Sequence, residues 1–552
     1  MTWLHTWFGL ALGYVLMVCF FFGALSVFDR EIDRWALPQT RFAPQVMPSF
    51  DKMLAPIFQK ITPEEEELQA ARRRVGGKLP DTMPPITWSA YTTHRDPVLD
   101  VFAEFAVTNN PNDPHDHVHG HLTIDPRDGK ILSHDQLKIG SGFFYPMHFS
   151  LHLTWFNLGY WIVALAALTM LAALVSGIVM HRKIFRELFT FRPQKQVRRS
   201  VLDLHNLTGV VALPFHFIFA LSGLIIFGGV YFPVSETMLK PMAEAHAQAE
   251  AAQMGLPFEA SGKPAPLASV DAMVVEAKRR WAARGMAGEV GFLNVSHLGD
   301  ANSYVSIYRA GSDRVTLVGQ GVHFSGPTGK VIYEEPAPST VSGVADFLTG
   351  LHLQHFEHWL LRWFYVLGGL MGCACIATGF LFFVEKRKRQ YAAQGVSIAR
   401  WADAFATAAV TGVVIAAISI LVANRALPAE LSHKSDWEKS IFWWSWLGAL
   451  VHAAWRSVPV AQARISPAWR EQCWAIASLA VVAVALNWTT TGDHIFKTIS
   501  NNYWAVAGVD LSLLFTAGIA CLAALNLSRR ERKADQIDTA LACDPELEAA
   551  GG

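Results

Sequence analysis

Charged residues are scarce in this sequence, and their two signs cancel. Asp, Glu, Lys and Arg make up 17% of the 552 residues, with 46 positive and 46 negative side chains, whereas 52% of the residues are apolar. A chain this apolar is typical of an integral membrane protein with water-exposed parts, and its net charge gives no indication of nucleic-acid binding. We therefore expect the lipid bilayer, and no nucleic acid, among its partners.

Several motifs are missing as well. The six cysteines lie in apolar segments or near the C-terminus, so a disulfide framework is not expected. The sequence lacks Cys-x-x-Cys-His, which excludes c-type haem, and it lacks Gly-x-Gly-x-x-Gly after a strand, which argues against a built-in nicotinamide or flavin domain. The first apolar run has no basic segment before it and no small-residue cleavage site after it, and we read it as an uncleaved membrane helix.

What the sequence does contain is an internal duplication with a spacing of 200 residues. A His-x-x-x-Gly motif begins at His5 and again at His205, and each copy opens an apolar run. His152 recurs as His352, ahead of two further apolar segments. A constant spacing of this kind indicates a repeated structural unit. Histidine at the edge of a membrane helix is costly and usually functional, so these four residues are the first site candidates.

The apolar runs predict an α-helical membrane bundle of about eight transmembrane helices. Basic clusters after the second, fourth and last runs place both termini in the cytoplasm. The predicted segments are helices at 1–28, 148–181, 204–232 and 351–385, cytoplasmic loops at 182–203 and 386–402, a four-helix membrane extension at 403–528, and a cytoplasmic tail at 529–552. The polar stretches 29–147 and 233–350 then lie on the outer side.

Both polar stretches read as small α+β domains. The expected helices are 62–75 and 269–284, and the expected strands or strand pairs are 101–107, 121–132, 304–308 and 322–332. Each stretch ends in two strands joined by a tight turn with a Gly-Lys pair. The duplicated unit is therefore helix, outer domain, helix.

Two imidazoles from different helices at one depth in an apolar bundle are what a b-type haem requires as axial ligands. We predict two such haems. His5 and His205 would hold one near the cytoplasmic side, and His152 and His352 would hold another near the outer side. Spacing alone does not fix helix rotation, so His148, His216, His181 and His355 remain alternative ligands.

A further histidine group lies in the first outer domain. His115, His117, His119 and His121 alternate along the chain, so a strand would turn all four to one face. Imidazole binds transition metals, which makes a surface metal site one interpretation. A solvated edge strand is the other.

The combined motifs resemble the PepSY-associated transmembrane helix family, which includes iron-regulated inner-membrane proteins and siderophore reductases of bacteria. The resembling segments are Leu4-His5-x-x-x-Gly9, Phe144 to His152, Val175 to Phe185, Asp203 to Asn206, Leu213 to His216, Ser222 to Leu224, Leu351-His352 and Thr378-Gly379. The resemblance covers roughly residues 1–390. It implies a four-helix core with two periplasmic PepSY-like domains in the bacterial inner membrane.

In the reductase branch, the resemblance implies two b-type haems that pass electrons toward an iron-siderophore. We therefore expect a ferric-siderophore reductase that takes electrons from quinol or from a separate reductase. Two alternatives stay open. The chain could be a non-redox binding or regulatory membrane protein, or it could transport an iron chelate.

Overall fold

The computed structural model divides into two compact units. Unit 1 comprises residues 1–39, 135–224 and 360–552, and unit 2 comprises residues 40–134 and 225–359. The structure describes residues 2–543 apart from 75–78, 80–82, 84, 93–95, 108–116, 133–136, 181–196, 232–240, 242–244, 246–252, 258, 318, 338, 394–397 and 458–465.

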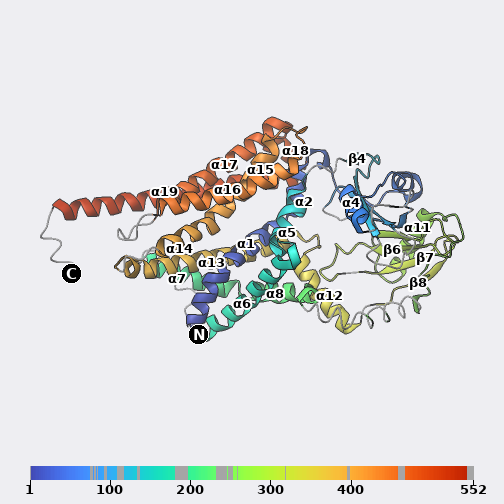
Figure 1. Ribbon diagram of the computed structural model, residues 1–552, viewed down its shortest axis with the longest axis horizontal. Coiled ribbons are helices and arrows are strands. Elements are labelled where there is room, and N and C mark those ends of the chain that lie inside the picture. Colours follow the sequence, from blue (N-terminus) through green and yellow to red (C-terminus); the bar gives the residue numbers. More distant parts are fainter. Residues whose placement is uncertain are drawn as a thin grey trace. The chain divides into compact units, whose positions relative to one another are not determined.

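Unit 2 is built on one antiparallel sheet of eight strands in the order β4-β3-β2-β1-β5-β6-β7-β8. The strands are β1 (Pro85–Tyr91), β2 (Leu99–Ala106), β3 (His117–Ile124), β4 (Ile131–Leu132), β5 (Val290–Ser296), β6 (Tyr304–Arg309), β7 (Gly321–Ser325) and β8 (Val331–Glu334). Each half of the duplication supplies four strands. β1 and β5 pair directly, so the two expected domains share one sheet and one hydrophobic core. Figure 1 labels β4 of the first half and β6, β7 and β8 of the second half in this unit.

The repeated turn confirms the duplication at the level of hydrogen bonds. The Asp125 amide donates to the Lys130 carbonyl, and Gly129 donates back to Asp125. The Ser325 amide makes the same bond to Lys330, 200 residues later, and Gly329 donates to Ser325. Both glycines have positive φ, at 76° and 67°, which is why the turn needs glycine.

Short helices cover one face of this sheet: α3 (Ala55–Phe58), α4 (Glu65–Arg74) and α11 (Val270–Ala283). The two halves cap each other at the helix starts. Asp271 accepts from the Ser49 hydroxyl at 2.5 Å and the Phe50 amide at 2.8 Å, while Asp51 accepts from the Ser269 hydroxyl at 2.6 Å and the Val270 amide at 3.1 Å. This exchange ties the halves together.

Replacing Asp51 or Asp271 with alanine should therefore destabilise unit 2 by about 1–2 kcal/mol each, because amides at a helix start lose a charged acceptor. Hydrogen exchange of the β1 and β5 backbone amides during urea unfolding of the whole protein measures the loss. Asp436→Ala, which removes a carboxylate that is 69% exposed, is the control. Equal unfolding of all three variants and the parent would contradict reciprocal capping.

Unit 1 holds six helical spans long and apolar enough to cross a membrane, found among the described residues. They are His5–Ser26, Trp155–Val179, Trp359–Arg387, Arg400–Ala426, Pro467–Thr491 and Trp504–Lys533. The helices involved are α1 (Thr2–Ser26), α6 (Leu158–Met180), α13 (Trp359–Ala393), α14 (Ile398–Thr407) with α15 (Val413–Ala426), α17 (Pro467–Thr491) and α19 (Trp504–Cys543). A bent pair, Arg198–Val211 with Leu213–Ile226, raises the number to seven if it forms one span.

The expected eight spans are not confirmed. The remaining predicted span, the second helix of the extension at 403–528, corresponds to α16 (Lys434–Arg456), which fails the same criterion. Its first seven residues, 434–440, precede the apolar run and include Lys434, Asp436, Glu438 and Lys439. Charges near one end shorten the stretch that can lie in hydrocarbon.

The expected single helix at 148–181 is wrong. α5 (Tyr145–Phe149) stops before His152, and α6 begins only at Leu158. Leu151 and His152 both have positive φ, which reverses the chain between the two helices. A Cβ on Gly159 would lie 1.7 Å from the Ser150 carbonyl, so this reversal requires glycine. His148 and His152 therefore do not share a helix face.

The expected helices at 204–232 and 351–385 are interrupted too. α7 (Val197–Val211) and α8 (Leu213–Ile226) meet at 62°, because Pro214 cannot donate to a carbonyl of the preceding turn. α12 (Thr340–Leu353) ends at Gln354 in a left-handed conformation, and α13 starts at Trp359. His352 thus belongs to the helix before the span.

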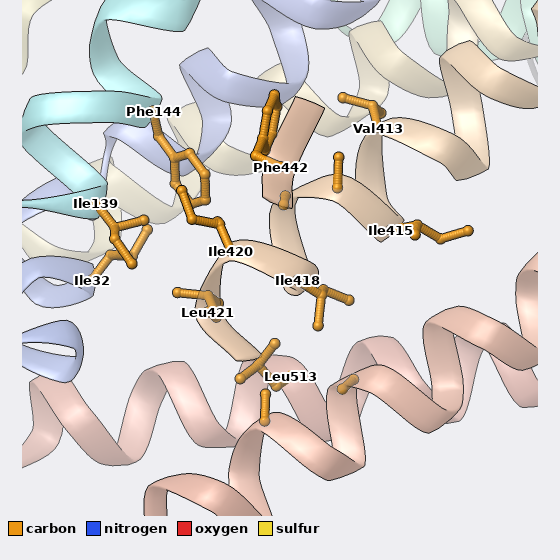
Figure 2. Packing of buried hydrophobic residues seen from close by; sticks show 14 of the residues in the cluster. Ile32, Ile139, Phe144, Val413, Ile415, Ile418, Ile420, Leu421, Phe442 and Leu513 are labelled. Carbon is orange, nitrogen blue, oxygen red and sulfur yellow. The ribbon is translucent and has the colours of Figure 1, made fainter. Parts of the chain in front are cut away.

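The C-terminal helices pack against the first half of the repeat. Ile418 and Ile420 of α15 lie in one buried cluster with Ile139 and Phe144, from the segment that leads into α5 (Figure 2). Ile32 of α2 (Asp29–Ala36) belongs to the same cluster. The extension is therefore part of the core of unit 1.

Candidate functional site

His5 and His205 lie face to edge inside unit 1. Their ring centroids are 6.2 Å apart, and the ring planes cross at 87°. His5 comes from the first turn of α1 and His205 from the middle of α7. The structure thus brings these two residues, singled out by the 200-residue spacing, into ring contact.

Hydrogen bonds fix the orientation of both rings. His205 Nδ1 donates to the Cys375 carbonyl at 2.7 Å, because a carbonyl can only accept. His5 Nδ1 lies 3.2 Å from Ser176 Oγ, whose own proton goes to the Ala173 carbonyl at 3.1 Å. The carbonyl partner requires His205 to carry its proton on Nδ1, and the Ser176 contact is compatible with the same tautomer of His5, in which Nε2 would be the metal-binding atom.

Glycines surround the two imidazoles. A Cβ on Gly379 would lie 3.4 Å from His205 Cε1, and a Cβ on Gly177 would lie 3.7 Å from His5 Cε1. One turn after His5, a Cβ on Gly9 would have no neighbour within 4 Å. Glycine at 177 and 379 lets the neighbouring helix backbones approach the two rings closely.

The ring separation matches what two ligands of one metal ion require. A ligating nitrogen lies roughly 2 Å from its metal, and a ring centre lies about 1 Å behind that nitrogen, so two rings whose Nε2 atoms both pointed at one metal ion would have centroids about 6 Å apart. The observed 6.2 Å agrees with this value. The residue type and the separation of His5 and His205 are thus those that two axial ligands of a b-type haem would need.

Two further histidines, His148 and His216, contact α1 farther from its N-terminus than His5. His148 Nδ1 donates to the Cys19 carbonyl at 2.7 Å, and its ring occupies the space that a Cβ on Gly23 would take, 2.8 Å away. His216 packs against Phe20 with ring centroids 5.2 Å apart and donates to the Gly368 carbonyl at 3.3 Å. Cys19 is 14 residues beyond His5, or about 21 Å along a helix.

His152 has a different environment from the four histidines described above. Its Nε2 donates to the Phe143 carbonyl at 2.8 Å, and its ring stacks on Phe143 at 4.6 Å. The predicted partner His352 lies in unit 2, in the last turn of α12, and His355 follows before α13. His181 lies outside the described residues. The His152–His352 pair stays a prediction.

The alternating histidines of β3 do not assemble a metal site in the described part of the chain, which contains no group of three His, Cys, Asp or Glu side chains able to hold an ion. His119 pairs with Glu67 at 3.1 Å, and His121 pairs with Asp100 at 3.3 Å. His117 lies on the same strand, and His115 is outside the described residues. Separate carboxylates satisfy these rings, so the solvated-strand interpretation is favoured.

A family profile described as "PepSY-associated TM region" matches residues 2–386. The chain belongs to this family. An uncharacterised protein of Pseudomonas aeruginosa is 25% identical over 303 residues, which cover 52% of this chain and 73% of that protein. All the candidate histidines in unit 1 fall within the part that matches the PepSY-associated family. The helices after Ile398 fall outside it.

Sequence reasoning missed one polar group of this PepSY-associated protein. In unit 2, Ser306 Oγ lies 2.8 Å from His323 Nδ1, and Glu335 Oε1 lies 3.3 Å from His323 Nε2. Ser306 is only 4% exposed, so this arrangement stabilises the sheet and presents no accessible nucleophile. Burial also raises the pKa of the adjacent Tyr308 to about 12. Polar residues alternate along β6 and β7, and this pattern could have indicated the group. It does not show that Ser306 lies opposite His323, because the pattern does not fix the register of the two strands.

Proposed function

We propose that this PepSY-associated protein is a haem b-containing electron-transfer protein of the bacterial inner membrane. In this proposal it reduces a ferric siderophore, or a similar ferric chelate, on the periplasmic side. The observation that carries the proposal is the pair of His5 and His205, whose separation and Nδ1 hydrogen bonds suit two axial ligands.

Bound b-type haem supplies a one-electron carrier whose potential depends on its ligands and surroundings. The residues of the chain would hold and tune it. His5 and His205 would provide the axial nitrogens of the inner haem, and Ser176 and the Cys375 carbonyl would keep the rings oriented. His152 and His352 would hold the second haem, with His148 and His216, which contact α1 at Cys19 and Phe20, as alternative ligands.

The direction of electron flow follows from the predicted topology. Basic clusters after the spans support cytoplasmic termini and periplasmic PepSY-like domains. Quinol or a separate reductase would supply the electron, and the chelated ferric ion would gain it. Oxygen donors hold ferrous iron less tightly than ferric iron, so the reduced ion leaves the chelate.

The visible spectrum of the purified protein tests this proposal. We expect sharp reduced α and Soret bands after dithionite, with about two haems per chain, and reoxidation by a ferric siderophore. A colourless protein, after expression with ample haem supply, would overturn the redox proposal. Uptake of an iron chelate into vesicles without any reductant would instead favour transport.

A further inference from the structure

Helix α12 carries an exposed apolar stripe. Val341 is 82% exposed, Val344 56% and Phe347 44%, and these residues follow one another at steps of three along the helix. Three-residue steps keep side chains on one face. The most exposed face of α12 is therefore apolar, the reverse of what a helix facing water shows.

The other side of α12 packs against the rest of unit 2. A Cβ on Gly350 would lie 1.9 Å from the Val315 carbonyl, so the helix backbone lies directly on that segment. The Leu317 amide donates to the Asp346 carbonyl at 3.2 Å. Just beyond the helix, the Glu357 amide donates to the Ser312 carbonyl at 2.9 Å. These contacts hold the helix with its apolar stripe pointing away from the rest of unit 2.

The chain continues from α12 straight into a membrane span. Only residues 354–358 separate α12 from Trp359, where α13 begins, and five residues reach at most about 18 Å. Trp359 is 52% exposed and Trp363 45%, which is typical of aromatic residues at a membrane–water boundary. The apolar stripe therefore starts within reach of the lipid headgroups.

The corresponding residues of the first repeat behave differently. Phe144 and Met147 stand 200 residues before Val344 and Phe347, and both are 1% exposed. They belong to the cluster that α15 and α16 complete. The residues matched to α12 by the repeat are thus covered by protein in the first half, whereas the stripe on α12 has no such cover in the described structure.

We propose that α12 lies in the plane of the membrane interface, with Val341, Val344 and Phe347 among the lipid chains, and that it anchors unit 2 to the bilayer. The helix contains no Lys or Arg, so apolar burial supplies the attachment. Anionic lipid is not required. This inference does not depend on haem binding.

Spin labels on the full-length protein in lipid nanodiscs test this placement. Val344→Cys carries the label in the stripe, and Ser342→Cys, exposed on another side of α12, is the matched control. Labelled parent protein corrects for the native cysteines. We expect the Val344 label to be relaxed at least threefold more by oxygen than by a water-soluble nickel chelate, and the Ser342 label to show the opposite preference.

Both values should stay the same when phosphatidylcholine is replaced by a mixture with phosphatidylglycerol, and in high salt. A Val344 label that is fully accessible to the nickel chelate would overturn the proposal, because the stripe would then face water. A Val344 label that is immobile and shielded from both reagents would also overturn it, because protein and not lipid would then cover the stripe.

Discussion

Replacing His205 with alanine is expected to remove about half of the haem bound per chain, since one of two bis-histidine sites loses an axial ligand. His5→Ala should cause the same loss. The double variant should lose no more than either single variant, because the two rings lie 6.2 Å apart and serve one site. Haem extraction as the pyridine complex, together with the reduced spectrum, measures the effect.

His119→Ala is the matched control. This ring is 54% exposed in unit 2 and pairs with Glu67, so its loss should leave the haem content unchanged. His148→Ala should lower haem content independently of His205 if His148 is a ligand of the second haem, because His148 contacts α1 at Cys19, far along the helix from His5. Full haem content in both His5→Ala and His205→Ala, with normal elution in gel filtration, would rule out ligation by this pair.

Ser176 gives a finer measurement on the same site. Ser176→Ala should keep the haem but shift its midpoint potential, because His5 Nδ1 loses its acceptor and the ring becomes a poorer donor to iron. A merely structural role for Ser176 would leave the potential unchanged.

Breaking the ion pair between Arg362 and Glu31 is expected to destabilise unit 1 by about 3–5 kcal/mol, because one buried charge loses its partner. Arg362 is 2% exposed, and its Nη2 donates to Glu31 at 2.8 Å and to the Val27 carbonyl at 2.7 Å. The guanidinium also lies over the Phe28 ring at 4.4 Å. The pair joins the start of α13 to α2 just after the first span.

Arg362→Met and Glu31→Met, made separately, should each lower the midpoint of thermal unfolding in detergent. The double variant should recover most of the loss, because apolar side chains of similar volume replace a buried pair well. Asp436→Ala, at an exposed carboxylate, is the control. Equal stability of the two single variants and the parent would show that water or lipid headgroups already compensate these charges.

The sequence predicted local features of this protein well. The acidic segment at 62–75 forms α4, the segment at 269–284 forms α11, and both Gly-Lys turns have the expected conformation. The 200-residue spacing identified His5 and His205 before any coordinates. The helices and turns are encoded by apolar periodicity and turn glycines within a few residues, and the duplication is visible because each copy keeps its own short motif.

Tertiary structure alone decided how those pieces combine. Nothing in the sequence shows that β1 pairs with β5, because strand pairing depends on which edges meet in space. The same holds for His148 and His152, which the apolar pattern placed on one helix and the chain reversal at Leu151 separates. The orientation of the His205 ring also depends on tertiary packing, because its acceptor, the Cys375 carbonyl, is 170 residues away in the sequence.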